Sequence, residues 1–450
     1  MRQLSKYQQK EILVLGMAKS GFVAAKLLHQ LGAKVTVNDH SSLSGHPHIS
    51  ELRALGIRVV DNEHPLDIVT ENTYLVVKNP GIMYTNPLIQ KAEQLGIPVV
   101  TEVALAALIS EAPFVAITGS NGKTTTTTLV GEMLKGSAKR PLVAGNIGTV
   151  LSEVAQEATG QDIIVAELSS FQLLGAQAFH PQIAVFLNLF DTHLDYHGTL
   201  EAYGQAKAKI TENQTERDWF VTSADDARVQ AFTVDSRAQR LYFSVNKKVE
   251  GAYLERGVLC FNGEAIVRRE DLVMLKGEHN IANALAAIVV AKIMDVPNAF
   301  IAEVLRSFKG VSHRLQYVET IHERVFYNDS KATNILATAK ALEAFQSPVV
   351  LLAGGLDRGN DFSALKPFLK KVKAIITFGE TKNKIQEAAK EAGVNRVQLV
   401  DTVEKAVQVA YDLSDVGDVI LLSPACASWD QFKNFEERGD MFVETVHRLR

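Results

Sequence analysis

The sequence has little cysteine, no long apolar run and no signal-peptide pattern in its first residues. Its 450 residues include only Cys260 and Cys426, too few and too far apart for a disulfide framework or a cysteine-rich zinc site. We therefore expect two buried thiols in a reducing compartment. No apolar run approaches the ~18 residues of a membrane span, and even the stretch 283–296 contains Lys292 and Asp295. The polar N-terminus lacks the apolar stretch of a signal peptide, so we expect a cytoplasmic protein.

A surplus of charge of one sign is also absent. The chain has 47 basic and 51 acidic residues, which leave a net charge of −4, so it lacks the basic footprint of a dedicated nucleic-acid binder. Hydrophobic residues make up 46% and charged residues 22%, values typical of a folded protein and not of a disordered or fibrous one. At roughly 100–200 residues per domain, the length predicts two to four domains, with three as the natural expectation.

A short apolar run followed by a glycine turn and a helix-period stretch occurs three times along the chain. The runs begin with EILVLG (11–16), PFVAITG (113–119) and RVFYNDS (324–330). This pattern predicts an α/β protein with parallel sheets. We expect a Rossmann-like N-terminal domain, a central mononucleotide-binding domain with a P-loop, and a Rossmann-like C-terminal domain, over residues 1–108, 109–310 and 311–450. Residues 217–273 are richer in β-forming residues, which predicts a smaller sheet inserted in or appended to the central domain.

The segment Gly119-Ser-Asn-Gly122-Lys123-Thr124 lies between an apolar strand and a helix. Glycines let backbone N–H groups converge on phosphate oxygens, a lysine neutralises the terminal phosphates and the Thr124 hydroxyl can bind Mg²⁺. The loop is two residues shorter than the usual GxxxxGK[ST] signature. The alternative is a glycine turn with a lysine at a helix start, but the preceding strand favours ATP binding. A P-loop alone does not distinguish a kinase, a GTPase, a motor and a ligase.

Candidate metal ligands follow two further apolar strands. Glu167 ends the run IIVAE, where a carboxylate suits a divalent cation, although a satisfied buried carboxylate is an alternative. His193 is expected immediately after the strand in FLNLFDTHLDYHG and is the best imidazole candidate. Lys207 lies in the helical stretch YGQAKAK, whose composition by itself indicates only an amphipathic helix.

Taken in order, these segments resemble a known family over essentially the whole chain. The matching segments are TGSNGKTTT, the strand-end Glu167, LNLFDTHLDYHG, YGQAK, GEHNIANALAA, Ser312–Arg314 and NDSKATN. The sequence resembles the ATP-dependent Mur ligases of peptidoglycan synthesis, which are related to folylpolyglutamate synthase. An ordered set of this kind is far more specific than any one motif. The resemblance implies ATP and two Mg²⁺ ions as cofactors.

The resemblance also implies roles for individual residues of the central domain. Lys207 would carry a carbamate made from CO₂, whose two anionic oxygens could bind Mg²⁺, and Asn283 would face the adenine. The implied catalytic residues are Lys123, Glu167, His193 and Lys207. The implied ATP-binding residues are Gly119, Ser120, Asn121, Gly122, Lys123, Thr124, Thr125, Asn283, Arg314 and Asp329. The implied metal ligands are Thr124, Glu167, His193 and Lys207.

The N-terminal domain carries Gly16-Met-Ala-Lys-Ser20-Gly21, a glycine turn that departs from GxGxxG, with Asp39 at the end of the second strand. Taken alone, this pattern is weak evidence for NAD. ELSSFQL is typical of the D-glutamate-adding branch of the family, in which the turn would hold a uridine diphosphate substrate. The implied contacts are Ser20, Gly21, Asp39, His40, Asn79, Pro80, Gly81, Asn146 and His193.

The C-terminal domain carries NDSKATN, GGLDRGNDF and SPACASWDQFKNFEERG. By resemblance, Lys331, Thr333, Arg358, Ser428 and Phe435 would surround the incoming D-glutamate, and cations with hydroxyls suit a dicarboxylate. A lysine can stand in the family where this chain has Arg358, so its exact contact is open. Ser428 and Phe435 could instead cap and pack the last helix. The DNPR-type signature of the diamino-acid-adding relative is absent.

The function implied is an ATP-dependent amide-bond ligase that adds D-glutamate to UDP-N-acetylmuramoyl-L-alanine through an acyl phosphate. We expect a monomer whose partners are these small molecules, with no nucleic acid and no membrane. Another Mur-family or folylpolyglutamate-type ligase is the enzyme alternative. A nucleotide-switch or NAD-binding regulatory protein is the alternative outside the ligases.

Overall fold

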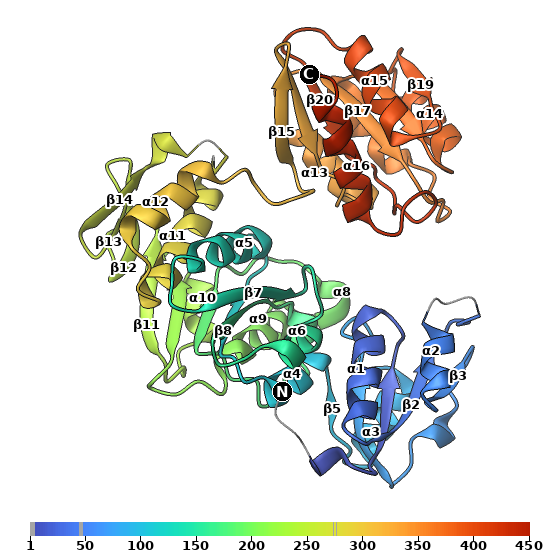
Figure 1. The fold of residues 1–450 in the computed structure, drawn as a ribbon, viewed down its shortest axis with the longest axis vertical. Helices are drawn as coiled ribbons and strands as arrows, with labels where there is room; N and C mark the ends of the chain where they lie inside the picture. Colours follow the sequence, from blue (N-terminus) through green and yellow to red (C-terminus); the bar gives the residue numbers. More distant parts are fainter. Residues whose placement is uncertain (1–4, 45–47, 273, 276) are drawn as a thin grey trace. The chain divides into compact units, whose positions relative to one another are not determined.

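The structure is a computed structural model that describes residues 5–44, 48–272, 274–275 and 277–450. The chain divides into two compact units, Met1–Phe308 and Lys309–Arg450. In the described part of the chain the strands form three sheets, two in the first unit and one in the second (Figure 1). Each sheet carries helices, so the α/β class predicted from the sequence is confirmed.

The first sheet is parallel throughout and has the strand order β3-β2-β1-β4-β5. Its strands are β1 (Glu11–Leu15), β2 (Lys34–Asp39), β3 (Arg58–Asp61), β4 (Thr73–Lys78) and β5 (Val99–Val100), and its helices are α1 (Lys19–Gln30), α2 (Ile49–Ala54) and α3 (Pro87–Gln94). Strands covered on both faces are continuous apolar runs, as in ILVL of β1. The strand order reverses between β1 and β4, which is where an open α/β sheet forms its ligand crevice.

The second sheet has the order β14-β13-β12-β11-β10-β9-β6-β8-β7. Its strands are β6 (Phe114–Thr118), β7 (Arg140–Gly145), β8 (Asp162–Glu167), β9 (Ile183–Phe186), β10 (Trp219–Ser223), β11 (Gln239–Ser244), β12 (Gly251–Glu255), β13 (Val258–Phe261) and β14 (Glu264–Arg268). The chain steps from β6 to β7 and β8 on one side and then to β9 on the other. The loops after β6, β8 and β9 therefore meet at one edge.

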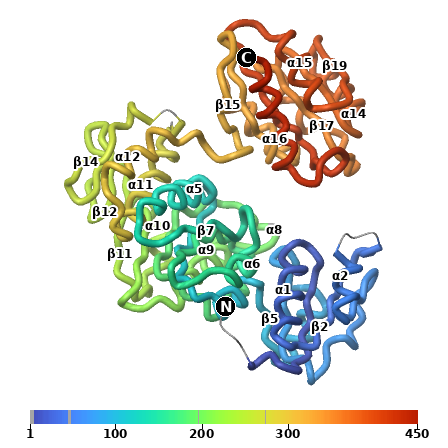
Figure 2. Tube along the Cα trace, in the orientation of Figure 1, coloured from blue at the N-terminus to red at the C-terminus, as the bar shows by residue number. Residues whose placement is uncertain are grey.

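The β-rich segment 217–273 was predicted as a smaller sheet inserted in or appended to the central domain, and the structure appends its strands to the second sheet. Its strands β10 to β14 extend the second sheet, because β10 pairs with β9 and β11 pairs with β12, both in parallel. Figure 2 shows β11 and β12 at this end of the sheet. Only β12, β13 and β14 pair antiparallel to one another. The region is thus a continuation of the sheet that carries the P-loop.

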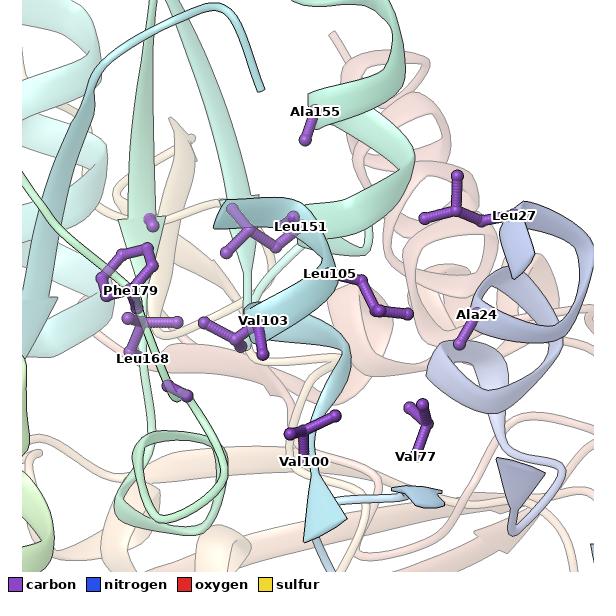
Figure 3. Close-up of a cluster of buried hydrophobic side chains, with 14 of the residues drawn as sticks. Ala24, Leu27, Val77, Val100, Val103, Leu105, Leu151, Ala155, Leu168 and Phe179 are labelled. Carbon is purple, nitrogen blue, oxygen red and sulfur yellow. The ribbon is translucent and has the colours of Figure 1, made fainter. Parts of the chain in front are cut away.

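Helices cover the second sheet and join it to the first. They are α4 (Glu102–Ile109), α5 (Lys123–Leu134), α6 (Leu151–Glu157), α7 (Ser170–Leu173), α8 (Leu194–His197), α9 (Leu200–Ala208), α10 (Ala227–Phe232), α11 (Glu278–Ile293) and α12 (Asn298–Ser307). Figure 3 shows Ala24 and Leu27 of α1 facing Leu105 of α4, with Leu151 of α6 close by. These side chains belong to one buried apolar cluster, so the two sheets of the first unit share a core.

The third sheet, in the second unit, has the order β15-β16-β20-β17-β18-β19. Its strands are β15 (Gln316–Ile321), β16 (Arg324–Asn328), β17 (Val349–Gly354), β18 (Val372–Phe378), β19 (Val397–Leu399) and β20 (Val419–Leu422), and its helices are α13 (Ile335–Glu343), α14 (Lys382–Glu391), α15 (Val403–Leu413) and α16 (Phe435–His447). Only the β15–β16 pair is antiparallel. The order reverses between β17 and β20, beside β16, so the loops after these three strands gather at one edge.

Short 3₁₀ segments complete the secondary structure: Ser5–Tyr7, Leu66–Ile68, Lys209–Thr211, Arg269–Asp271 and Ser363–Lys371. Both cysteines are buried and free, as predicted. None of the helices within the described ranges combines the length and the apolar character needed to cross a membrane.

Candidate active site

The loop between β6 and α5 has the backbone that the P-loop pattern predicts. Gly119 and Gly122 have φ values of 153° and 82°, in the region that favours glycine. A Cβ on Gly122 would lie 2.2 Å from Oδ1 of Asn283. The Lys123 ammonium donates to the carbonyls of Gly119 (2.8 Å) and Ser120 (3.0 Å). The lysine therefore folds back over the loop at the start of a helix, where anions bind.

The loop after β9 braces the P-loop. The backbone N–H of Asn121 donates to Oδ1 of Asn188 (2.9 Å), and Nδ2 of Asn188 donates to the Asn121 carbonyl (3.1 Å). The backbone N–H of Phe190 donates to the Ser120 hydroxyl (2.9 Å). Asn188 and Phe190 were not predicted as site residues, and they fix the two predicted positions Ser120 and Asn121.

Lys207 contacts the P-loop, although its sequence context indicated only an amphipathic helix. The side chain is 1% exposed, on α9. Its ammonium nitrogen donates to the Gly119 carbonyl (2.9 Å) and to the Thr118 hydroxyl (3.4 Å). Burial first, and then the charge of Lys123, hold the pKa of Lys207 well below its usual range, against an opposing effect of Glu167. Such an amine loses its proton readily and becomes a nucleophile.

Glu167 ends β8 as predicted and is 1% exposed. Its Oε1 accepts a hydrogen bond from Nδ2 of Asn146 (2.8 Å), whereas Oε2 is buried and receives no hydrogen bond from any described residue. A buried carboxylate oxygen without a donor is unusual, because such groups are costly to bury. It is the kind of oxygen that Mg²⁺ prefers as a ligand. The structure thus joins Asn146, predicted on the nucleotide sugar, to the predicted metal carboxylate.

The sequence predicted His193 immediately after its strand, and this prediction is wrong. The strand β9 ends at Phe186, and His193 lies further on as the N-cap of α8, with φ of 58°. Its ring centroid lies 5.1 Å from that of Phe171 and 6.0 Å from that of Tyr203. Across the described ranges, no group of three or more His, Cys, Asp or Glu side chains could hold a metal ion. The predicted ligand set includes a lysine and a threonine, so it is of another composition.

Asn283 lies on the apolar helix α11, where its buried side chain covers Gly122. Its Nδ2 donates to Oδ1 of Asn280 (3.4 Å). The helix is apolar on all sides because it packs between α5 and the strands β10 to β12. Asn283 is therefore a polar group that the core of the second sheet presents to the P-loop.

The first sheet has a cavity of about 220 Å³ at its topological switch point. Oδ2 of Asp39 accepts from the backbone N–H of Met17 (2.8 Å), and Nδ2 of Asn79 donates to the Ser20 hydroxyl (3.2 Å). A Cβ on Gly21 would lie 1.9 Å from the Gly16 carbonyl oxygen, so only glycine fits there. The cavity is lined by Gly16, Met17, Ala18, Asp39, His40, His64, Asn79, Ile82 and Asn86. Pro80 and Gly81 belong to the same loop as Asn79.

His64 lines this cavity but was not singled out from the sequence. Its ring centroid lies 5.3 Å from that of His40, and its Nδ1 is 2.5 Å from Oδ1 of Asn38. Burial, and then the neighbouring His40, lower the pKa of His64. The Lys19 ammonium, on α1, donates to the Gly148 carbonyl (3.2 Å). This bond links the first helix to the loop that carries Asn146.

In the second unit, Asp329 follows β16 and is largely buried. It accepts hydrogen bonds from the Ser423 hydroxyl (2.8 Å) and the backbone N–H of Leu315 (3.1 Å). Burial raises its pKa to about 6, although these hydrogen bonds and the charge of Arg314 oppose the shift. The acid is thus held where a modest change of environment alters its charge.

The residues expected around D-glutamate fall into two groups in the second unit. The Lys331 ammonium lies 5.8 Å from the ring centroid of Phe435, and the backbone N–H of Thr333 donates to the Lys331 carbonyl (2.9 Å). The Arg358 guanidinium lies 4.9 Å from the ring centroid of Trp429, which the sequence did not mark. Ser428 has a buried hydroxyl that makes no hydrogen bond with a described residue.

Arg438 joins the loops that carry these groups and was missed from the sequence. Its guanidinium is fully buried and donates to the carbonyls of Ser330 (2.9 Å) and Cys426 (3.0 Å). Burial lowers its pKa to about 10. An arginine in the first turn of a surface helix gives no signal in sequence that it points inward.

Three family models match the chain. The Mur ligase MurD-like N-terminal domain matches residues 10–101, the Mur ligase middle domain matches residues 117–291, and the Mur ligase glutamate ligase domain matches residues 313–426. Two similar relatives are each named UDP-N-acetylmuramoylalanine–D-glutamate ligase. The protein from Geobacillus sp. (strain WCH70) is 58% identical and that from Bacillus mycoides (strain KBAB4) is 57% identical, and each match covers 100% of both chains.

Solved structures share the fold at low identity. The UDP-N-acetylmuramate–alanine ligase of Thermotoga maritima has a TM-score of 0.55 at 21% identity, and the match covers 98% of this chain and 100% of that one. The MurF ligase of Thermotoga maritima, solved in complex with ADP, has a TM-score of 0.52 at 16% identity, with coverage of 100% and 98%. These two likenesses bear on the fold alone.

Proposed function

The chain belongs to the Mur ligase family, and we propose that it is an ATP-dependent ligase that joins D-glutamate to UDP-N-acetylmuramoyl-L-alanine. The observation that carries the proposal is the position of Lys207. A buried lysine with a depressed pKa touches the P-loop carbonyl of Gly119, close to the charge of Glu167. The reaction of a nucleotide switch does not require a reactive amine beside the P-loop. A ligase that handles two anionic substrates requires additional metal ligands there, and a carbamate on Lys207 would supply them.

The P-loop supports the first step of the reaction. A carboxylate and an amine do not form an amide in water without activation, so the γ-phosphoryl group of ATP moves to the substrate carboxylate and gives an acyl phosphate and ADP. Lys123 can turn from the carbonyls of Gly119 and Ser120 to the phosphate oxygens and stabilise the charge that spreads over them. Asn283, whose side chain covers Gly122, is proposed to face the adenine.

The D-glutamate amine completes the reaction. It attacks the acyl carbon, loses a proton, and the tetrahedral intermediate expels phosphate. No protein nucleophile is required. Lys331, Thr333, Arg358, Ser428 and Phe435 are proposed around the amino acid, and Arg314 and Asp329 at the nucleotide. The Ser428 hydroxyl, which has no hydrogen-bond partner among the described residues, and the cations of Lys331 and Arg358 suit a dicarboxylate.

The buried Oε2 of Glu167, which receives no hydrogen bond from a described residue, suits Mg²⁺. We propose that two ions bind there, with the Thr124 hydroxyl and His193 as further oxygen and nitrogen donors. When bound, Mg²⁺ neutralises the charge on the transferring phosphoryl oxygens. The Lys207 amine adds to CO₂ with the formation of an N–C bond and the release of one proton. The depressed pKa of Lys207 favours this, because only the neutral amine has the lone pair that reacts.

The cavity of the first sheet is proposed to take the uridine diphosphate. Ser20 and Gly21 would face the pyrophosphate and Asp39 and His40 the uracil, while the loop Asn79–Gly81 closes the pocket. Asn146 and His193 would meet the far end of this substrate. The bond from Lys19 to Gly148 supports this, because it ties the loop of Asn146 to the first sheet.

We propose the domain limits 1–108, 109–310 and 311–450. The last strand of the first sheet ends at Val100 and the first strand of the second begins at Phe114, which supports a limit between them. We also propose a monomeric enzyme of the cytoplasm, where ATP and UDP-linked sugars are made.

A panel of amino acids tests the proposal. The protein is incubated with ATP, Mg²⁺ and UDP-N-acetylmuramoyl-L-alanine, and ADP release is measured with one amino acid at a time. We expect D-glutamate to support turnover at least roughly a hundredfold faster than L-glutamate, D-alanine or meso-diaminopimelate, because a site built to pair buried polar groups rejects ligands that leave them unpaired.

Three controls make this result interpretable. Omission of the nucleotide sugar should reduce ADP release to background. Equal rates with L-glutamate and D-glutamate would point to a folylpolyglutamate-type ligase. ADP release that no amino acid stimulates would point to a nucleotide switch and would refute the proposal.

A further inference from the structure

Lys78, at the end of β4, is a buried lysine that the proposed reaction does not use. Its side chain is 1% exposed, and within the described ranges no acidic side chain pairs with it. Burial lowers its pKa to about 8. An unpaired buried ammonium is costly, so it needs hydrogen-bond acceptors that offset the lost hydration.

The acceptors come from the loop that follows β4. The ammonium nitrogen donates to the carbonyls of Ile82 (2.8 Å) and Pro80 (3.0 Å), and lies 3.4 Å from the carbonyl of Asn79. An ammonium has three N–H groups, so the carbonyls of Ile82 and Pro80 and one further partner use all its donors, and the more distant Asn79 carbonyl can only share one of them. Asn79 and Ile82 both line the cavity of the first sheet. Lys78 is not among the lining residues, but it holds the backbone of two residues that are, and so it helps to fix the shape of the cavity.

The remaining partner comes from the second sheet. The hydroxyl of Tyr196 lies 3.3 Å from the Lys78 nitrogen, 3.0 Å from the Ile82 carbonyl and 3.3 Å from the Pro80 carbonyl. The hydroxyl accepts from Lys78 and can donate its single proton to one of the two carbonyls. Tyr196 lies on α8, the short helix that His193 caps. The same cluster thus joins the cavity loop to the segment that carries His193.

We propose that Lys78 is a positioning residue that couples the nucleotide-sugar cavity to the placement of His193, by clamping the loop Asn79–Ile82 against Tyr196. The inference rests on the proposed function for the identity of the ligand. The clamp itself is a property of the free protein. Binding at the cavity and the order of α8 are therefore linked through one buried polar cluster, and loss of any member loosens both ends.

The test compares Lys78→Met and Tyr196→Phe with the unaltered protein. Methionine keeps most of the apolar stem and removes the ammonium, and phenylalanine keeps the ring and removes only the hydroxyl. We expect each change to raise KM for UDP-N-acetylmuramoyl-L-alanine roughly tenfold, the size of effect that loss of a hydrogen bond to a charged group produces. KM for ATP and for D-glutamate should stay within about twofold, because the cluster holds only the loop that lines the nucleotide-sugar cavity. The double variant should be no worse than Lys78→Met.

Lys91→Met is the matched control. Lys91 also lies in the first sheet's domain and donates to a backbone carbonyl, that of Leu66 (2.7 Å), but away from the cavity loop. It should leave all three KM values unchanged. Melting temperatures identify a variant that fails to fold, in which case Tyr196→Phe decides the outcome.

Hydrogen exchange of the free protein provides a readout that does not depend on the reaction. In both variants, exchange should rise in residues 79–84 and 193–198 and stay unchanged in the second unit. Unchanged exchange in both segments, or an equal rise of all three KM values, would overturn the proposal. If the unaltered protein does not turn over this nucleotide sugar, the proposed function fails, and the exchange data still decide on the clamp.

Discussion

Lys207→Ala is expected to reduce ligase turnover roughly 10- to 100-fold, because loss of a group that orients a metal ligand typically has an effect of that size. The substitution removes an amine that touches the P-loop at the Gly119 carbonyl and that is poised, by burial, to react as a neutral base. Turnover is measured as D-glutamate-dependent ADP release at saturating substrates, with ATP binding followed separately.

The carbamate account makes a second, sharper prediction for the same variant. A short-chain carboxylic acid such as acetate or propionate carries the two oxygens that the carbamate would supply. Added acid should restore part of the lost turnover in Lys207→Ala and none in the unaltered protein. Rescue would exclude a merely structural lysine, which a free carboxylate cannot replace, whereas absence of any rescue would count strongly against a carbamate at this position.

Lys209→Ala is the matched control for this position. Lys209 begins the 3₁₀ turn that follows α9 and is partly exposed, with an ion pair to Glu212 at 3.3 Å. Exposed pairs of this kind contribute little. The variant should therefore retain full turnover and should not respond to added acid.

Lys123→Ala is expected to abolish measurable turnover, a loss of roughly 10³-fold or more, since a cation on the transferring phosphoryl group contributes effects of that order. Lys123 begins α5 directly after Gly122, where the helix N-terminus and the loop N–H groups face an anion. The expected loss is mainly in kcat, because the charge on the phosphoryl oxygens grows in the transition state.

The opposite end of the same helix supplies the control. Lys135, the C-cap of α5, is exposed and pairs with Glu132 at 2.6 Å. Lys135→Ala should change turnover by less than about twofold. If Lys123→Ala hydrolysed ATP at the normal rate, the assignment of the P-loop would be wrong.

Much of the fold was predictable because parallel strands covered on both faces are continuous apolar runs. The apolar runs ILVL and VVLLAG, for example, predict the strands β1 and β17. The hairpin β15–β16 was not predictable. Its turn residues His322 and Glu323 both have positive φ, at 46° and 62°, and neither is the glycine or asparagine that marks such turns in a sequence. The extension of the second sheet also depended on pairing that no local pattern specifies.

In the candidate site, too, the features that depend on neighbouring residues were predictable and those that depend on distant residues were not. The P-loop could be predicted because strand, glycine turn and helix lie within a few residues of one another. The contacts of Lys78 could not, because one of its hydrogen-bond partners, Tyr196, lies 118 residues further along the chain. Arg438 likewise acts through a carbonyl 108 residues away, that of Ser330. His193 was expected at a strand end, but the strand stops early and a braced loop carries the chain to α8.

The central claim is that the chain activates a carboxylate as an acyl phosphate before the amine of D-glutamate attacks. Isotope transfer tests it directly. UDP-N-acetylmuramoyl-L-alanine labelled with oxygen-18 in the alanine carboxylate is converted with ATP and D-glutamate, and the released phosphate is analysed by mass spectrometry. The account predicts one labelled oxygen in each phosphate formed. Product formation with unlabelled phosphate would contradict it.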